Sequence, residues 1–152
     1  MTKKNNKYTV IRDTREHSEK GWLFDEDESC AGTKVQKLDY GDYSIDGIDD
    51  NIFAIERKGS VNEIYQNFGV DKDRFYRELE ALSKFKYSYL ILECDVGDIV
   101  RGCSFSTMSP NFVLSCILSL TTRYGINVLF VGKHGKEMAK MLFKKMHKMF
   151  GK

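Results

Sequence analysis

Residues 51–58 read Asn-Ile-Phe-Ala-Ile-Glu-Arg-Lys, an apolar run that ends in three charged side chains. The apolar part predicts a β-strand. Because side chains alternate between the two faces of a strand, Glu56 and Lys58 are expected to project together while Arg57 points the other way. The sequence therefore predicts a carboxylate and an ammonium group side by side at the end of a strand.

A second carboxylate, Asp42, lies fourteen positions before Glu56. Gly41 favours a turn, so a preceding antiparallel strand is expected to bring Asp42 next to Glu56. Two acids and a lysine that converge at a sheet edge suit a metal-dependent phosphodiesterase, because Mg²⁺ prefers carboxylates, carbonyls and retained water. We expect Asp42 and Glu56 to hold Mg²⁺ or Mn²⁺, helped by the backbone carbonyl of Arg57. Lys58 would orient the attacking water or stabilise charge on the phosphate.

The same pattern also has a simpler interpretation. An acid followed at a distance by Glu-x-Lys occurs by chance in many soluble proteins. In that case residues 56–58 are a charged strand end with a surface ion pair of little energetic value. The surrounding sequence has to separate the two interpretations.

The composition predicts one compact domain. The chain has 152 residues, of which 41% are hydrophobic, which is enough for one core and too little for two ordinary domains. Charged residues make up 30% of the chain, yet the net charge is only +2, so total charge neither requires nor excludes a polyanionic partner.

The cysteines and the hydropathy pattern predict an intracellular, cytoplasmic protein without a membrane segment. The cysteines lack the spacing of a zinc site or a disulfide framework, and we expect reduced thiols at Cys30, Cys94, Cys103 and Cys116. No apolar stretch is long enough for a membrane span, and no signal-peptide core follows the basic start.

Hydrophobic periodicity predicts the order of the elements. A first strand at 7–12 is followed by a polar loop over 13–33 with an acidic run at 25–28 that we expect to be solvated. The remaining strands are expected at 33–38, 42–45, 51–58, 87–93 and 126–131, and the helices at 60–68, 71–84, 110–123 and 135–150.

This order predicts an α/β fold. The segments at 33–38, 42–45 and 51–58 are separated by turn signals and are expected to form an antiparallel β-meander. The later strand-helix-strand units favour parallel pairing by crossover. We therefore expect a mixed central sheet flanked by helices on both faces.

Three motifs occur in order: Asp13-Thr14-Arg15-Glu16, Gly41-Asp42-Tyr43 and Ile55-Glu56-Arg57-Lys58. Together they resemble the nuclease domain of the XPF-family structure-specific endonucleases, whose pattern is DxRE, then GD, then ERK-x3-D. Nearly the whole chain takes part in the resemblance, including Arg74-Phe75 and Ser109-Pro110. One departure is Asn62, which stands where the family pattern has aspartate.

The resemblance implies a single XPF-type nuclease domain over 1–152 with a restriction-endonuclease-like fold of the PD-(D/E)XK class. It implies an Mg²⁺- or Mn²⁺-dependent endonuclease that cuts branched, flap or nicked DNA in repair, recombination or replication. Relatives usually carry helix-hairpin-helix modules after the nuclease domain, and the 152 residues contain none. We therefore expect DNA binding from the domain itself or from a partner.

The resemblance also implies further site residues. Asp13 would be an additional catalytic acid near the metal, with a polar strand-end cap as the alternative. Arg15 and Glu16 would touch DNA or brace the site through an ion pair. Arg57 would contact DNA or support the site from behind, and Arg74 would contact a phosphate or lie on a solvated helix face.

A lysine stripe marks the last expected helix. Lys136, Lys140, Lys144 and Lys148 follow one another at intervals of four, opposite a methionine-rich face. The first three are candidate contacts to the DNA backbone, and the alternative is a solvated helix face.

Two rivals to the nuclease assignment use the same fold. A catalytically inactive nuclease-like domain would serve in DNA binding or dimerisation. A docking module would bind a helicase or replisome protein through the methionine-rich helix. The partner predictions are thus DNA, and a second copy of the chain or a helicase or replication protein.

Overall fold

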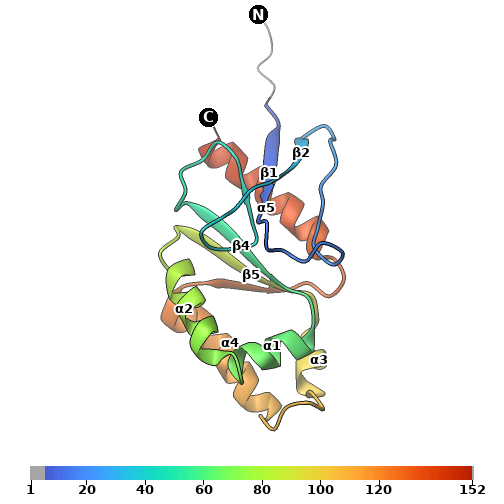
Figure 1. Ribbon diagram of the computed structural model, residues 1–152, viewed down its shortest axis with the longest axis vertical. Helices are drawn as coiled ribbons and strands as arrows, with labels where there is room; N and C mark the ends of the chain where they lie inside the picture. Colours follow the sequence, from blue (N-terminus) through green and yellow to red (C-terminus); the bar gives the residue numbers. More distant parts are fainter. Residues whose placement is uncertain (1–5, 152) are drawn as a thin grey trace, which may run out of the picture.

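The computed structural model describes residues 6–151. Figure 1 shows one sheet with helices on both of its faces. Six strands lie in the order β2-β1-β3-β4-β5-β6. Their bounds are β1 (Tyr8–Arg12), β2 (Cys30–Val35), β3 (Tyr43–Ile45), β4 (Phe53–Lys58), β5 (Tyr87–Leu92) and β6 (Asn127–Phe130). The predicted α/β class with a mixed central sheet is confirmed.

The pairing of the strands puts β4 in the interior of the sheet. β4 pairs in parallel with β5, which pairs in parallel with β6. β3 is antiparallel to both of its neighbours, β1 and β4. The stretch that ends in Glu56, Arg57 and Lys58 is therefore bordered by strands on both sides.

The four expected helices are present, with one short addition. They are α1 (Val61–Phe68), α2 (Lys72–Leu82), α4 (Pro110–Tyr124) and α5 (Gly135–Phe150). α4 begins as predicted, since the Ser109 side chain accepts a hydrogen bond from the Phe112 N–H at 3.1 Å. The sequence analysis missed α3 (Val96–Val100), because five residues are too few for a helical period to be visible.

Side-chain alternation along β4 divides the core in two. Ala54 packs in the cluster that includes buried side chains of α1, α2 and α4. Phe53 and Ile55 belong to the cluster on the opposite face, which α5 covers. The same strand therefore contributes to both hydrophobic layers.

The predicted β-meander is wrong in its first strand. β2 spans Cys30–Val35 rather than 33–38, and it pairs in parallel with β1 rather than with β3. A parallel pair needs a crossover of a dozen or more residues, and the polar segment 13–29 provides it. β1 then lies between β2 and β3, so only the β3–β4 hairpin survives from the predicted meander.

The described chain, from residue 6 to residue 151, contains no helix with the length and hydrophobicity needed to cross a membrane.

The aromatic centre of the α5 layer gives a stability prediction. Phe143 is fully buried, and its ring centroid lies 5.2 Å from that of Phe24 and 5.8 Å from that of Tyr8. Phe143→Ala removes these contacts and leaves a cavity, so we expect a loss of about 3–5 kcal/mol in the free energy of unfolding, measured with urea. The control Phe105→Ala, at an 86% exposed side chain, is expected to change it by less than about 0.5 kcal/mol. Equal effects of the two substitutions would contradict the assigned packing.

Candidate active site

Gly41 allows β3 to approach β4 closely enough to deliver Asp42. Its φ of +87° lies in the left-handed region, and a Cβ there would lie 3.1 Å from the Cβ of Ala54. The backbone N–H of Asp42 donates to the Ile55 carbonyl at 2.7 Å. The antiparallel approach predicted from the sequence thus places Asp42 beside the end of β4.

The Asp42 carboxylate is oriented by the backbone of β4. Its Oδ2 atom accepts a hydrogen bond from the Arg57 N–H at 2.7 Å. Burial raises the pKa of Asp42 well above its ordinary value, and the negative charges of Glu56 and Glu16 add to the effect. Asp42 and Glu56, called the acid pair below, therefore lie close enough to repel each other.

Glu56 and Lys58 project to the same side of β4, as alternation predicted. The Lys58 Nζ lies 3.3 Å from the Glu56 Oε1. Burial raises the pKa of Glu56 to about 7 even though Lys58 acts against the shift, and the charge of Glu78 raises it further. Burial opposes the charge of Lys58, but the carboxylates around it, Glu56 first, outweigh burial and raise its pKa.

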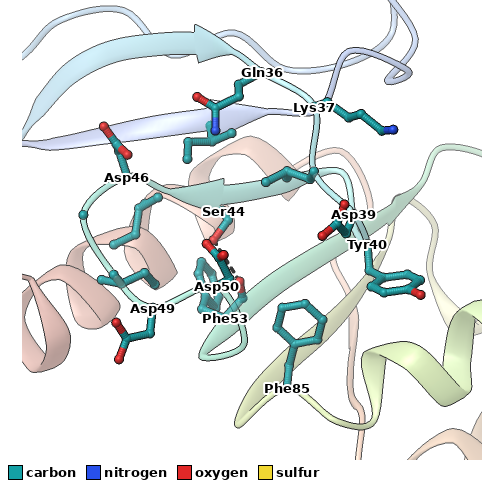
Figure 2. A pocket seen from close by; sticks show the side chains of 15 residues that line it. Gln36, Lys37, Asp39, Tyr40, Ser44, Asp46, Asp49, Asp50, Phe53 and Phe85 are labelled. Atoms are coloured by element: carbon teal, nitrogen blue, oxygen red, sulfur yellow. Dashed lines mark hydrogen bonds between the residues drawn. The ribbon is translucent and has the colours of Figure 1, made fainter.

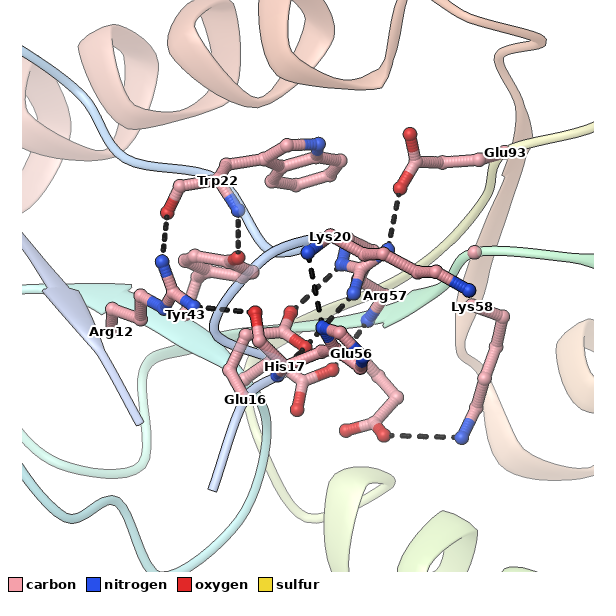
Figure 3. Close-up of polar contacts among 12 residues, drawn as sticks. Arg12, Glu16, His17, Lys20, Trp22, Tyr43, Glu56, Arg57, Lys58 and Glu93 are labelled. Carbon is pink, nitrogen blue, oxygen red and sulfur yellow. Dashed lines mark hydrogen bonds and ion pairs between the residues drawn. The ribbon is translucent and has the colours of Figure 1, made fainter. Parts of the chain in front are cut away.

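Arg57 lies on the opposite face of β4 and is only 8% exposed. Its guanidinium donates to both carboxylate oxygens of Glu16, at 2.8 and 3.0 Å, and to Glu93 at 2.8 Å (Figure 3). The Trp22 ring centroid lies 5.9 Å from its Cζ. This geometry agrees with the predicted role of Arg57 as a residue that supports the site from behind. Its contact with DNA stays a prediction.

Glu93 is a site residue that the sequence analysis missed. It directly follows β5, which runs parallel to β4 with Lys58 opposite Leu92. The carboxyl ends of parallel strands meet at the same edge of a sheet, so an acid after β5 was a readable signal for a partner of Arg57. Of the two possibilities for Glu16, the bracing ion pair is the one observed.

Asp13 and Arg15 form a pair beside the acid pair. The Arg15 Nε donates to the Asp13 Oδ2 at 2.8 Å, and the Leu38 N–H donates to the Asp13 Oδ1 at 2.7 Å. Burial opposes ionisation of Asp13, but these hydrogen bonds outweigh burial and lower its pKa. Across residues 6–151, no three acidic, histidine or cysteine side chains gather in a way that could hold a metal ion. Asp13 as a third metal ligand or catalytic acid stays a prediction.

Two adjoining pockets open at the acid pair, and both are lined by Arg15, Asp42 and Glu56. The first, called the Tyr40 pocket below, is also lined by Tyr40, Glu78 and Leu82. The second, called the Lys58 pocket below, is also lined by Lys20, Lys58 and Ser60. The two acids and the lysine predicted at the end of β4 therefore meet at the surface, where a ligand can reach them.

The other predicted DNA contacts lie outside both pockets. Arg74 on α2 is exposed and pairs with Asp71 at 3.3 Å. The lysines of α5 lie on the helix that covers the opposite face of the sheet. Lys136 sits over the Phe24 ring, Lys140 pairs with Asp27 at 2.9 Å, and Lys144 lines a separate hollow near His147. Their role in DNA binding stays a prediction.

Two further features lie away from the acid pair. Asn62, at the position of the family aspartate, accepts a hydrogen bond from the Cys103 thiol at 3.1 Å and lines neither pocket. Figure 2 shows another hollow beside β3, bordered by Asp39, Asp46 and Asp50. Among the described residues Lys37 is the only lysine or arginine that lines it, and none of the three motifs contributes a residue to it.

Comparisons with known proteins agree with the XPF resemblance. The sequence profile of the ERCC4 domain family matches residues 12–144. The structure of XPF from Aeropyrum pernix is similar with a TM-score of 0.61 at 14% identity, covering 91% of this chain and 60% of that one. XPF from Aeropyrum pernix in complex with DNA gives a TM-score of 0.64 at 15% identity, covering 94% of this chain and 66% of the other. The chain thus spans 60 to 66% of the length of these structures. No curated protein matches the sequence significantly.

The Arg57 ion pairs give a second stability prediction. Arg57→Leu leaves the Glu16 carboxylate, whose side chain is 6% exposed, buried without a cation. We expect a loss of about 3–5 kcal/mol in the free energy of unfolding. The double variant Arg57→Leu/Glu16→Leu is expected to recover part of this loss, because it removes the uncompensated charge.

Urea unfolding of the wild-type protein, Arg57→Leu and the double variant measures the change in the free energy of unfolding. Arg74→Leu is the control, because Arg74 forms an exposed ion pair that contributes at most about 1 kcal/mol. A double variant no more stable than Arg57→Leu would show that the buried Glu16 charge is not what destabilises the single variant.

The raised pKa of Glu56 predicts that the stability of the fold depends on pH. In the folded protein the pKa of Glu56 is about 7, whereas an unfolded glutamate titrates near 4.3. Between these two pH values, the folded state holds a proton on Glu56 that the unfolded state has lost. The contribution of protonated Glu56 to the free energy of unfolding is therefore fully present below about pH 4.3 and is lost as the pH rises through about 7. Relative to Glu56→Gln, the wild-type protein should lose about 3–4 kcal/mol of stability from pH 4 to pH 8. Urea unfolding in EDTA at both pH values measures this, and a constant difference between the two proteins would disprove it.

Proposed function

Because the chain belongs to the ERCC4 domain family, we propose that it is a metal-dependent endonuclease that hydrolyses phosphodiester bonds in branched, flap or nicked DNA. The observation that carries the proposal is the acid pair next to the Lys58 ammonium, in a pocket open to solvent. A fold similar to that of XPF in complex with DNA supports DNA as the substrate.

The donor set fits a hard cation. Asp42 and Glu56 offer carboxylate oxygens. Burial first, and then neighbouring carboxylates, raise the pKa of each, so an added cation would stabilise their ionised forms. Mg²⁺ or Mn²⁺ is held by one or two carboxylates together with water, so the acid pair suffices without a third acid. When bound, such an ion would neutralise phosphate charge and lower the pKa of the attacking water.

The charge of Lys58 limits what its side chain can do in the reaction. Its pKa is raised by the surrounding carboxylates, so its side chain stays protonated at neutral pH. A protonated amine donates hydrogen bonds and cannot take a proton from water. We therefore propose that Lys58 acts as a hydrogen-bond donor and not as a base, either orienting the attacking water or stabilising the charge that develops on the phosphate oxygens. Its Nζ lies 3.3 Å from Glu56, at the edge of the Lys58 pocket.

We assign Arg57, Glu16 and Glu93 a positioning role in the reaction. Arg57 presents its backbone N–H to Asp42 while its side chain is held from the opposite face by two carboxylates. This arrangement fixes the end of β4, and with it the relative positions of Asp42, Glu56 and Lys58.

A cleavage assay tests the proposal. Labelled 3′-flap, nicked and plain duplex DNA are incubated with the wild-type protein in Mg²⁺, Mn²⁺ or EDTA. We expect metal-dependent cleavage of the flap or nicked DNA, reduced about 100-fold or more in Asp42→Asn, Glu56→Gln and Lys58→Ala. The matched control is Glu80→Gln, an exposed glutamate on α2 that lines neither pocket, and it should cut at the wild-type rate.

Two outcomes would contradict the assignment. Variants that cut as fast as the wild-type protein would exclude these side chains from the reaction. A folded wild-type protein that binds DNA but cuts none of the substrates with either metal would favour the inactive nuclease-like domain. Size-exclusion chromatography in the same buffers tests the predicted second copy, and binding to a helicase or replication protein stays a prediction.

A further inference from the structure

One cation at the Lys58 pocket has no carboxylate partner within residues 6–151. Four lysine and arginine side chains line this pocket, and three of them form ion pairs: Arg15 with Asp13, Arg57 with Glu16, and Lys58 with Glu56. The fourth is Lys20, which is exposed and in none of the salt bridges. Its charge is therefore available to a ligand that enters the pocket.

A tight turn fixes the backbone of Lys20. The Lys20 N–H donates to the His17 Nδ1 at 3.0 Å, and the Gly21 N–H donates to the His17 carbonyl at 2.8 Å. Arg12, which is buried in β1, donates to the same carbonyl at 2.5 Å. The turn is thereby tied to the sheet, so Lys20 is presented from a defined position.

The turn is also tied to the active-site end of β4. Glu16, directly before His17, forms the buried ion pair with Arg57. In Figure 3 the Lys20 side chain extends from the turn toward the end of β4 that carries Lys58. Lys20 and the acid pair line the same pocket. The free ammonium group therefore lies beside the residues assigned to the cut, although it comes from a different part of the chain.

The distribution of charge around the acid pair is uneven. Beyond the shared residues, the Tyr40 pocket adds three acids, Asp13, Asp39 and Glu78, and no lysine or arginine. The Lys58 pocket adds three cations, Lys20, Arg57 and Lys58, and two acids, Glu16 and Glu63. A polyanionic strand that crosses the acid pair gains attraction on the Lys20 side and meets further negative charge on the other.

We propose that Lys20 binds a backbone phosphate of the DNA strand, next to the phosphate that is cut. The inference rests on the proposed function and adds a substrate-binding residue that none of the three motifs contains. A lysine holds phosphate as a point charge, so this contact carries no base specificity. It acts by releasing one condensed counterion from the DNA, and it should weaken as salt is added.

Binding measurements on uncut DNA test the proposal. The Glu56→Gln protein is titrated into a labelled 3′-flap DNA, with and without Lys20→Ala, at salt concentrations from 50 to 200 mM. We expect weaker binding by Lys20→Ala and a slope of log K against log salt that is smaller by about 0.9. The affinity advantage conferred by Lys20 should then shrink about 3.5-fold over this range.

Three further proteins make the result specific. Lys84→Ala removes an exposed lysine that lines neither pocket and should leave the affinity and the slope unchanged. Lys20→Arg keeps the charge and should retain the slope. In the background with active Glu56, Lys20→Ala should still cut DNA, with the loss appearing mainly in KM and growing smaller as salt is raised.

The outcomes separate the two proposals. If the wild-type protein cuts DNA but Lys20→Ala binds with unchanged affinity and slope, the role of Lys20 is overturned and the nuclease assignment stands. An equal loss in Lys84→Ala also overturns it, because the effect would then come from total charge. Absence of both cleavage by the wild-type protein and binding by Glu56→Gln would overturn both proposals.

Discussion

A buried guanidinium holds together the end of the sheet where the candidate site lies. Arg57 is 8% exposed, and a cation in such a place is costly unless carboxylates surround it. Glu16 and Glu93 meet this need from two different segments, the crossover after β1 and the residue after β5. Because the crossover must approach β4 to supply Glu16, it also carries its neighbouring side chains to the edge of the pocket.

The two faces of β4 differ in how the charges of their side chains are balanced. On the Arg57 face a cation is matched by two carboxylates, and the pKa of Glu16 is lowered because the ion pair outweighs the effect of burial. On the other face Glu56 and Asp42 lie close together. Burial raises the pKa of both, and the charge of Glu56 raises that of Asp42 further. The first face is satisfied by the protein's own charges. The second keeps two carboxylates beside one lysine, and this is the face on which the proposed metal-dependent hydrolysis would take place.

The failures of sequence-based prediction in this chain have a common physical origin. Strands β4 and β5 and helices α4 and α5 were predicted because their signals are local: alternation, apolar runs, an N-cap before proline and helical periodicity. β2 was misplaced because the long crossover from β1 decides which strand it pairs with. The sequences of β1 and β2 do not indicate whether the two strands pair in parallel. α3 was missed because its main signal is the capping box between Asp95 and Asp98, which is not visible as periodicity.

The sequence by itself determined the class of the fold, the direction in which Glu56, Arg57 and Lys58 point, and the approach of Asp42 to Glu56. Each of these follows from the geometry of one strand or one turn. Only the tertiary structure decided that Glu93 completes the ion pairs of Arg57 and that Asp13 is engaged by Arg15. It also decided that Lys20 lies at the pocket without a carboxylate partner among residues 6–151. Ion pairs depend on distance in space, and that distance is set by the path of the 13–29 crossover and by the order of the strands, which no local pattern records.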